Sequence, residues 1–336
     1  MLSTTNLDAK LLDWKELRSK INFSGLLLGN GASRAVWEGF AYRALYDIAA
    51  NKNIKQRLGQ QDLELFTKFG DNRNFEQVLS ALTTARLVNE ALDLNTNLIV
   101  ERYDSVQNAL IEAVQKTHIP WAKVKGDVLQ HIRNALRLYT HVYTTNYDLL
   151  VYWAIMHKKQ RGFKDYFFNP PRFDLANTTI RGQATLVHYI HGALHLYRTP
   201  TGGTYKRSAT PDENLLDLFG SPLESLYPLL IAEGTADDKL KSIYSSDYLS
   251  FAYSKLAHHG GPLCIFGSAL SESDRHIVDA INGAQVEVAA VSLQPTRNGD
   301  IIKAKKANIF QLLPNVDLHF FDSTTHPLGD PALKIG

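Results

Sequence analysis

The sequence contains one cysteine, Cys264, among its 336 residues. A single thiol cannot form an intrachain disulfide, and it cannot supply the ligands of a multi-cysteine zinc module. Cys264 lies in the apolar run Pro-Leu-Cys-Ile-Phe, which favours a small buried side chain. The fold must therefore rest on noncovalent packing.

Long apolar runs and strong net charge are also missing. No uninterrupted apolar stretch approaches the roughly 20 residues that a membrane-spanning helix needs. Residues 1–20 mix acidic and basic side chains and lack the apolar core of a signal peptide. The net charge of +2 gives no overall attraction to nucleic acid, and the basic, aromatic stretch 158–177 is typical of a solvated surface loop. We expect a cytoplasmic protein with no membrane segment and no direct binding of nucleic acid.

Apolar strand-like runs alternate with helical patterns along the chain, which predicts an α/β fold with a Rossmann-like, doubly wound parallel sheet. The predicted strands cover residues 26–28, 141–145, 186–190, 262–266, 286–293 and 316–321, with a possible strand at 227–232. Helices are predicted over residues 7–21, 34–50, 149–156 and 246–258, and a hairpin over 194–205.

The stretch 43–137 is predicted to be almost entirely helical, because apolar residues recur at helical spacing and no proline precedes Pro120. This length exceeds that of one crossover helix. We therefore expect one domain over residues 1–336, with a large helical insertion at 46–136 and smaller loop or helix insertions at 157–184 and 197–258. The helical insertion is expected to cover a binding crevice or to make oligomer contacts.

The first strand ends in the turn Gly29-Asn30-Gly31-Ala32-Ser33. Glycines let a ligand approach the backbone, and the N-terminus of the following helix favours phosphate. Arg34 occupies the third glycine position of G-x-G-x-x-G, so the turn departs from the dinucleotide fingerprint. A tight structural turn and a phosphate cradle both fit this stretch.

Three more predicted strands end in polar or glycine-containing clusters: Thr145-Asn146-Tyr147-Asp148, His191-Gly192 and Gly267-Ser268. The carboxyl ends of parallel strands share one edge of a sheet, so all four clusters are expected to line one crevice. Structural roles are also open, because residues 146–148 fit a helix cap and His191 fits a hydrogen-bonded loop histidine.

The three histidines His188, His191 and His195 suggest a metal, but His188 and His191 fall on opposite faces of an extended strand. No H-E-x-x-H motif is present. Residues 271–274 read as a capping box, with Asp274 as a capping residue. The sequence predicts no metal site.

In their order, the four strand-end clusters resemble the motif series of sirtuins, and most closely the sirtuin-like domains of bacterial anti-phage defence proteins, which hydrolyse NAD. The likeness covers the α/β parts and not the helical insertion. Sirtuin deacylases carry a four-cysteine zinc module that this chain lacks, so no zinc is expected. Arg34-Ala35-Val36-Trp37 also stands where sirtuins have a proline-aspartate-phenylalanine-arginine run.

The resemblance implies an NAD+ glycohydrolase, with NAD as substrate, that releases nicotinamide and ADP-ribose and serves as a defence effector. It implies that Asn146 orients water or ribose, that His191 is the base, and that Asp148 holds the nicotinamide end or supports Asn146. The implied nucleotide-binding residues are Gly29, Asn30, Gly31, Ala32, Ser33, Thr145, Gly267 and Ser268. The expected partners are further copies of the chain or a defence protein such as a hexameric ATPase. A non-catalytic NAD or ADP-ribose sensor is the alternative, and a deacylase is disfavoured.

Overall fold

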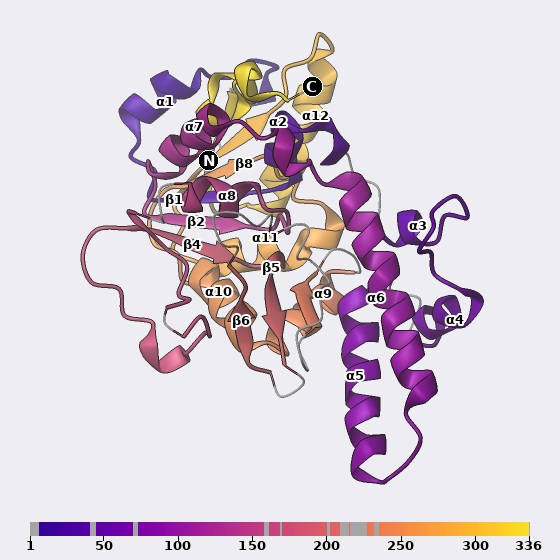
Figure 1. Ribbon diagram of the computed structural model, residues 1–336. Helices are drawn as coiled ribbons and strands as arrows, with labels where there is room; N and C mark the ends of the chain where they lie inside the picture. Colours follow the sequence, from indigo (N-terminus) through magenta and orange to yellow (C-terminus); the bar gives the residue numbers. More distant parts are fainter. Residues whose placement is uncertain are drawn as a thin grey trace.

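A seven-stranded parallel sheet forms the centre of the protein (Figure 1). The computed structural model describes residues 7–40, 45–69, 73–157, 161–168, 170–199, 202–208, 215, 227–231 and 235–335. The large sheet has the order β10-β9-β8-β1-β2-β4-β3, and a three-stranded antiparallel sheet has the order β6-β5-β7. The strands are β1 (Gly25–Leu28), β2 (His141–Thr144), β3 (Phe163–Lys164), β4 (Thr185–Tyr189), β5 (Gly192–Arg198), β6 (Thr204–Lys206), β7 (Tyr227–Leu230), β8 (Leu263–Phe266), β9 (Val288–Leu293) and β10 (Asp317–Asp322). The predicted α/β class with a parallel sheet is confirmed.

Strand β1 lies in the middle of the sheet, with β2 on one side and β8 on the other. All four of its residues are buried, which explains the uninterrupted apolar run. The strands that follow β1 in the sequence, β2 and β4, lie on one side of it, whereas the later strands β8, β9 and β10 lie on the other side. The strand order therefore reverses between β1 and β8. In open α/β sheets, ligands bind beyond the carboxyl ends of strands at such a reversal.

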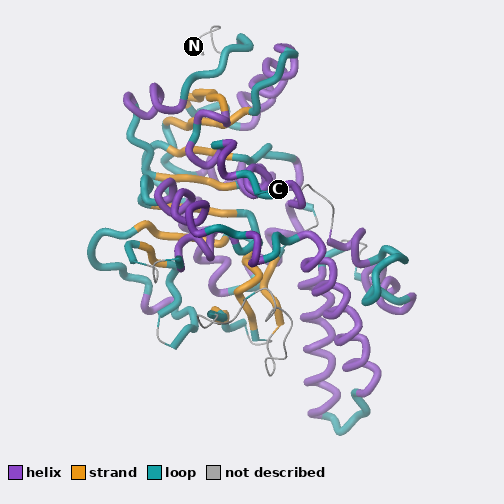
Figure 2. The backbone as a smooth tube through the Cα atoms, turned by 45° about the horizontal axis from the view of Figure 1, so that its top comes forward, coloured by secondary structure: helices purple, strands orange, loops and turns teal. Residues whose placement is uncertain are grey.

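Helices surround the sheet, and two of them project away from it (Figures 1 and 2). The helices are α1 (Trp14–Lys20), α2 (Asn30–Val36), α3 (Leu45–Ala49), α4 (Gln60–Lys68), α5 (Phe75–Ala91), α6 (Asn97–Thr117), α7 (Gly126–Leu136), α8 (Leu150–Met156), α9 (Ala236–Tyr244), α10 (Asp247–Ala257), α11 (Arg275–Gly283) and α12 (Gly299–Leu312). The mainly helical character predicted for residues 43–137 is confirmed in α3 to α7, and α5 and α6 form the projecting hairpin. Within the described ranges, no helix is long and apolar enough to cross a membrane.

Two predicted helices have different bounds. The helix after β1 begins at Asn30 and ends at Val36, because Trp37 is extended and its indole N–H donates to the Thr117 carbonyl at 3.2 Å. The prediction of one helix over 34–50 is therefore wrong. Of the helix predicted over residues 7–21, the structure has an α-helix over residues 14–20, which begins after Asp13 because the Asp13 side chain caps it. Leu12 instead pairs with Phe321 at the sheet edge.

The stretch 158–177 is not simply a surface loop. Within it, β3 pairs with β4, and Phe163, Tyr166 and Phe173 are buried. Phe167 is also buried, with its ring centroid 4.7 Å from that of Tyr248. The aromatic side chains in this stretch are thus mostly part of the core. Residues 158–160 and 169 lie outside the described residues.

The buried His326 makes the fold sensitive to acid. Its Nδ1 accepts a hydrogen bond from the Leu328 N–H at 3.1 Å, and its Nε2 lies 2.9 Å from the Tyr139 hydroxyl. Burial lowers the pKa of His326 to about 3. The unfolded chain, with an ordinary histidine pKa, therefore takes up a proton on acidification before the folded protein does, and the free energy of unfolding falls as the pH drops below about 6.5.

We expect His326→Asn to lower stability at pH 7 but to reduce the loss between pH 7 and pH 5. Asparagine still accepts from Leu328 and does not titrate, so up to about 1.4 kcal/mol per pH unit is removed from the acid dependence. Urea unfolding at both pH values, with the exposed His258→Asn as control, measures this. An equal pH dependence in wild type and His326→Asn would contradict the prediction.

Candidate functional site

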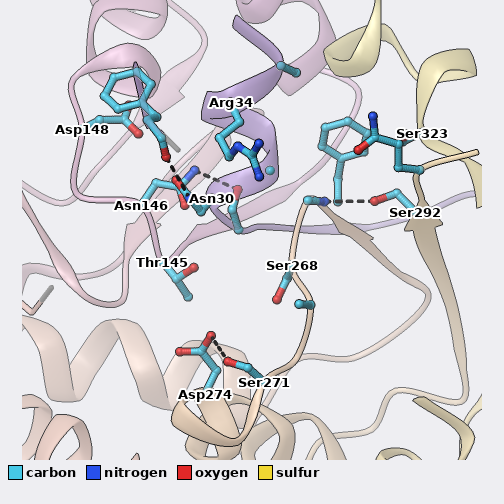
Figure 3. A pocket seen from close by; sticks show the side chains of 18 of the residues that line it. Asn30, Arg34, Thr145, Asn146, Asp148, Ser268, Ser271, Asp274, Ser292 and Ser323 are labelled. Atoms are coloured by element: carbon cyan, nitrogen blue, oxygen red, sulfur yellow. Dashed lines mark hydrogen bonds between the residues drawn. The ribbon is translucent and has the colours of Figure 1, made fainter. Parts of the chain in front are cut away.

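A cavity of about 900 Å³ lies at the carboxyl edge of the parallel sheet, at the ends of β1, β2 and β8. This volume is within the range of small-molecule and cofactor sites. Of the site residues predicted from the sequence, the cavity is lined by Gly29, Asn30, Gly31, Thr145, Asn146, Asp148, His191, Gly267 and Ser268. Ala32 and Ser33 are not among the lining residues. In Figure 3, Thr145 and Ser268 lie on opposite sides of the open space.

The glycines at the ends of β1 and β8 are required by packing. A Cβ on Gly29 would lie 2.6 Å from the Ser268 Cα, and a Cβ on Gly31 would lie 2.8 Å from the Gly267 Cα. The Gly31 N–H donates to the Gly267 carbonyl at 2.8 Å, and Gly267 has a φ of +71°. The Gly31 N–H is thus already paired, so it could donate to a phosphate on this turn only if its hydrogen bond to the Gly267 carbonyl were broken.

Asn146 is held by two hydrogen bonds from its side-chain amide. Its Nδ2 donates to the Gly29 carbonyl at 3.0 Å and to the Ser33 hydroxyl at 2.9 Å, and Ser33 donates to Asp148. A carbonyl only accepts, so the Gly29 contact fixes which end of the amide carries the hydrogens. Among the described residues, no group donates to the Asn146 Oδ1. That oxygen is available to a water or a hydroxyl group in the cavity.

Further hydrogen bonds, to His118 and Asp148, hold the loop that carries Asn146. The buried His118 accepts a hydrogen bond from the Leu149 N–H at 3.0 Å, and its other ring nitrogen lies 2.9 Å from the Ile119 carbonyl. The Asp148 Oδ1 accepts from the Leu150 N–H at 2.8 Å. Asp148 therefore contacts the first turn of α8, although the N-cap position of that helix is Leu149 and has no side-chain cap bond, and Asp148 also holds Ser33. No sequence pattern pointed to His118, which follows α6 at a distance from the motif.

On the opposite wall, His191 lies against side chains that the sequence did not indicate. Its Nε2 is 2.8 Å from the Nε2 of His276, and both rings are buried. The Asp274 carboxylate accepts from the Lys239 ammonium at 2.8 Å. Asp274 occupies the N-cap position of α11, but its carboxylate makes no cap bond to that helix and residues 272–274 form a 3-10 turn, so the expected capping box is wrong. His188 and His195 lie elsewhere, His188 beside His141 and His195 beside Tyr152.

The charges in this cluster follow from burial. Burial, with His276 and Lys239 nearby, holds the pKa of His191 well below its usual range. Burial and Lys239 lower the pKa of His276 to about 4. Burial works to raise the pKa of Asp274, but Lys239 and His191 outweigh it and lower that pKa. At neutral pH the cluster thus combines two neutral imidazoles, a carboxylate and an ammonium group.

A further part of the cavity wall is basic and polar. Arg34, Lys305 and Lys334 line it, together with Ser292, Ser323 and Glu38, whose carboxylate lies 3.0 Å from Arg34 and 3.8 Å from Lys334. Figure 3 shows Arg34 on α2, with Ser292 and Ser323 near the ends of β9 and β10. The Ser292 hydroxyl accepts from the Gly267 N–H at 2.9 Å and so supports the β8 turn. An anionic ligand on this wall would compete with Glu38 for Arg34 and Lys334.

The fold and the cavity define an α/β protein with a ligand-sized site at the carboxyl edge of a parallel sheet. The chain belongs to the DUF4917 family, a domain of unknown function, which matches residues 26–328. No curated protein matches the chain. The family description assigns no chemistry, so the resemblance to sirtuin-like domains stays a prediction.

We expect Gly29→Ala to destabilise the protein by about 1–3 kcal/mol, because its Cβ would meet the backbone at the β8 end, which has no flexible side chain to move away. Gly283→Ala is the matched control, since a Cβ at this last residue of α11 has nothing within 4 Å. Alanine there should be neutral or stabilising by up to about 1 kcal/mol. Urea unfolding measures both, and equal stabilities for the two variants would refute the packing role of Gly29.

Proposed function

We propose that the protein is an NAD+ glycohydrolase that cleaves the nicotinamide–ribose bond and releases nicotinamide and ADP-ribose. The observation that carries the proposal is the placement of Asn146 and His191 on the wall of one cavity. The amide is anchored with its oxygen free, and the imidazole is neutral at physiological pH. Both lie where a ligand at the strand reversal would be bound.

The proposed reaction needs few catalytic groups. Nicotinamide leaves as a neutral molecule from a cationic ring, so its departure needs no general acid. Ordinary glycosidases differ, because they use a pair of carboxylates as acid and base or nucleophile. What remains is to position a water, to stabilise an oxocarbenium-like ribose, and to place a base near the ribose hydroxyls.

Asn146 suits the positioning of water or ribose. Both hydrogens of its amide are donated, one to the Gly29 carbonyl and one to the Ser33 hydroxyl. The group that remains to contact a water or the ribose is therefore the Oδ1 of Asn146. The hydrogen bond from Ser33 to Asp148 makes Asp148 a positioning residue for this network. Of the two roles implied for Asp148, support of Asn146 is therefore favoured over contact with the nicotinamide.

His191 is the proposed base, and burial keeps its ring neutral but, by lowering its pKa, also weakens it as a base. A neutral imidazole has a lone pair that accepts a proton from a ribose hydroxyl. In the structure this ring already shares a hydrogen bond with His276. That contact specifically favours the second candidate function, a module that holds NAD or ADP-ribose without turnover, because the ring must exchange its partner before it acts as a base.

The nucleotide is proposed to place its pyrophosphate near Gly29, Gly31 and Ser268, with Arg34 as a nearby cation. In keeping with the sirtuin-like resemblance, we assign the hydrolase a role as a defence effector, restrained by assembly or a partner because unregulated loss of NAD+ would kill the host.

We expect the purified protein to release nicotinamide from NAD+, and Asn146→Ala and His191→Ala each to lower that rate about 10²–10⁴-fold. NAD+ affinity by calorimetry should change much less, because the pyrophosphate contacts lie on other strand ends. Asn282→Ala and His258→Ala are matched controls, as exposed residues outside the cavity lining, and should turn over at the wild-type rate.

Melting temperatures separate the two interpretations of these side chains. A purely structural Asn146 or His191 would lose stability, binding and turnover together. Folded variants that bind NAD+ and turn over at the parent rate would refute the catalytic roles. A wild type that binds NAD+ without releasing nicotinamide would favour the binding module.

A further inference from the structure

Three metal-ligating side chains meet on the His191 side of the cavity. His191, His276 and Asp274 have ligand atoms that all lie within 4.8 Å of one another. His191 comes from the loop before β5, Asp274 from the turn before α11, and His276 from α11 itself. No other trio of histidine, cysteine or carboxylate ligands gathers this closely in the part of the chain that the structure describes.

The three groups are in the protonation states that a metal requires. Metal ions bind neutral imidazole and ionised carboxylate. Burial disfavours the charged form of both histidines, and the nearby Lys239 favours the charged form of Asp274. Binding therefore needs no net loss of a proton at neutral pH, but the proton shared between the two Nε2 atoms must shift to the Nδ1 of its own ring.

Outer partners orient two of the three ligands. The Thr145 backbone at the His191 ring favours the protonated form of that histidine, and the His191 Nε2 faces the Nε2 of His276. The Asp274 Oδ2 accepts from the Ser271 hydroxyl at 3.3 Å, and its Oδ1 accepts from Lys239. Such second contacts are typical of metal-ligating histidines and carboxylates.

Distances favour a small tetrahedral ion. Two nitrogens bound to one Zn²⁺ lie roughly 3.3 Å apart, given Zn–N bonds of about 2.0–2.1 Å. The two Nε2 atoms are 2.8 Å apart now, so the rings must separate by only about half an ångström. His191 and Asp274 also line the cavity, so a further coordination position would open toward it.

We propose that His191, His276 and Asp274 bind a divalent transition-metal ion, best matched by Zn²⁺, with an open position facing the cavity. Two nitrogens and one carboxylate with an open position form a common zinc arrangement, whereas Mg²⁺ and Ca²⁺ prefer oxygen ligands. The ion competes with the Lys239 ammonium for Asp274. If the proposed hydrolase function holds, the ion also occupies the lone pair of His191 and inhibits hydrolysis.

Calorimetric titration of ZnCl₂ into chelator-treated protein, without NAD+, tests the site. We expect one Zn²⁺ per chain, with affinity at least tenfold weaker in His276→Ala and in Asp274→Asn. Asp274→Asn guards against a folding defect, because the Asp274 side chain is 26% exposed and its replacement is nearly isosteric. His258→Ala, an exposed histidine outside the cluster, is the control and should bind as wild type does.

Lys239→Met gives the opposite prediction. Removal of the competing ammonium should tighten Zn²⁺ binding, whereas a merely structural cluster would bind no better. Absence of Zn²⁺ binding to wild type, or equal binding by wild type and both ligand variants, would overturn the proposal.

The proposal of a metal site and the proposal of a hydrolase can be refuted independently of each other. Because the titration contains no NAD+, Zn²⁺ binding that depends on His276 and Asp274 supports the site even if nicotinamide is never released. If hydrolysis is observed, nicotinamide release should fall as Zn²⁺ occupancy rises and return on chelation. Unchanged release at full occupancy would overturn the inhibitory role.

Discussion

At the centre of the sheet, the backbone of Gly29 and Gly31 lies against Gly267 and Ser268, with no room for a Cβ on either of the first two residues. The contact joins β1 and β8, the two strands between which the strand order reverses. It brings two strand-end turns into one surface at the place where α/β sheets bind ligands. Without it, the cavity would lose one of its walls.

The polar groups of the site depend on that contact in turn. The Gly29 carbonyl that β1 places at the sheet edge accepts from Asn146, and Asn146 donates also to Ser33. Ser33 is then held by Asp148, which also accepts from the start of α8. Each member of this network has a fixed partner, so the free oxygen of Asn146 is presented to the cavity without the freedom of an isolated side chain. Fixed orientation is what positioning of a reactant requires.

Much of the central sheet was predictable, because its strands are short apolar runs that end in polar or glycine clusters. Parallel strands share a carboxyl edge, and this rule alone placed Gly29, Asn146, His191 and Ser268 around one cavity. The predicted start of α2 at residue 34 is too late, because Gly29 is the N-cap residue and Gly31 already lies in the first turn of the helix. The burial of Phe167 was also missed, since a basic neighbourhood suggested exposure.

No local sequence pattern indicated which residues contact His191. His276 lies 85 residues further along the chain, and Lys239 contacts Asp274 across 35 residues. Asp274 fitted a capping pattern, yet its carboxylate is drawn away from the helix by the buried ammonium of Lys239. Such pairings arise from the way α9 and α11 pack beside the cavity, which the hydrophobic periodicity of each helix does not specify.

The most direct test of the central claim is a crystal structure of Asn146→Ala with NAD+ bound. The account predicts that the nicotinamide ribose lies between His191 and the position of the lost amide, with the pyrophosphate near Gly29 and Ser268. NAD+ bound outside this cavity, or with its adenine end at His191, would contradict the account.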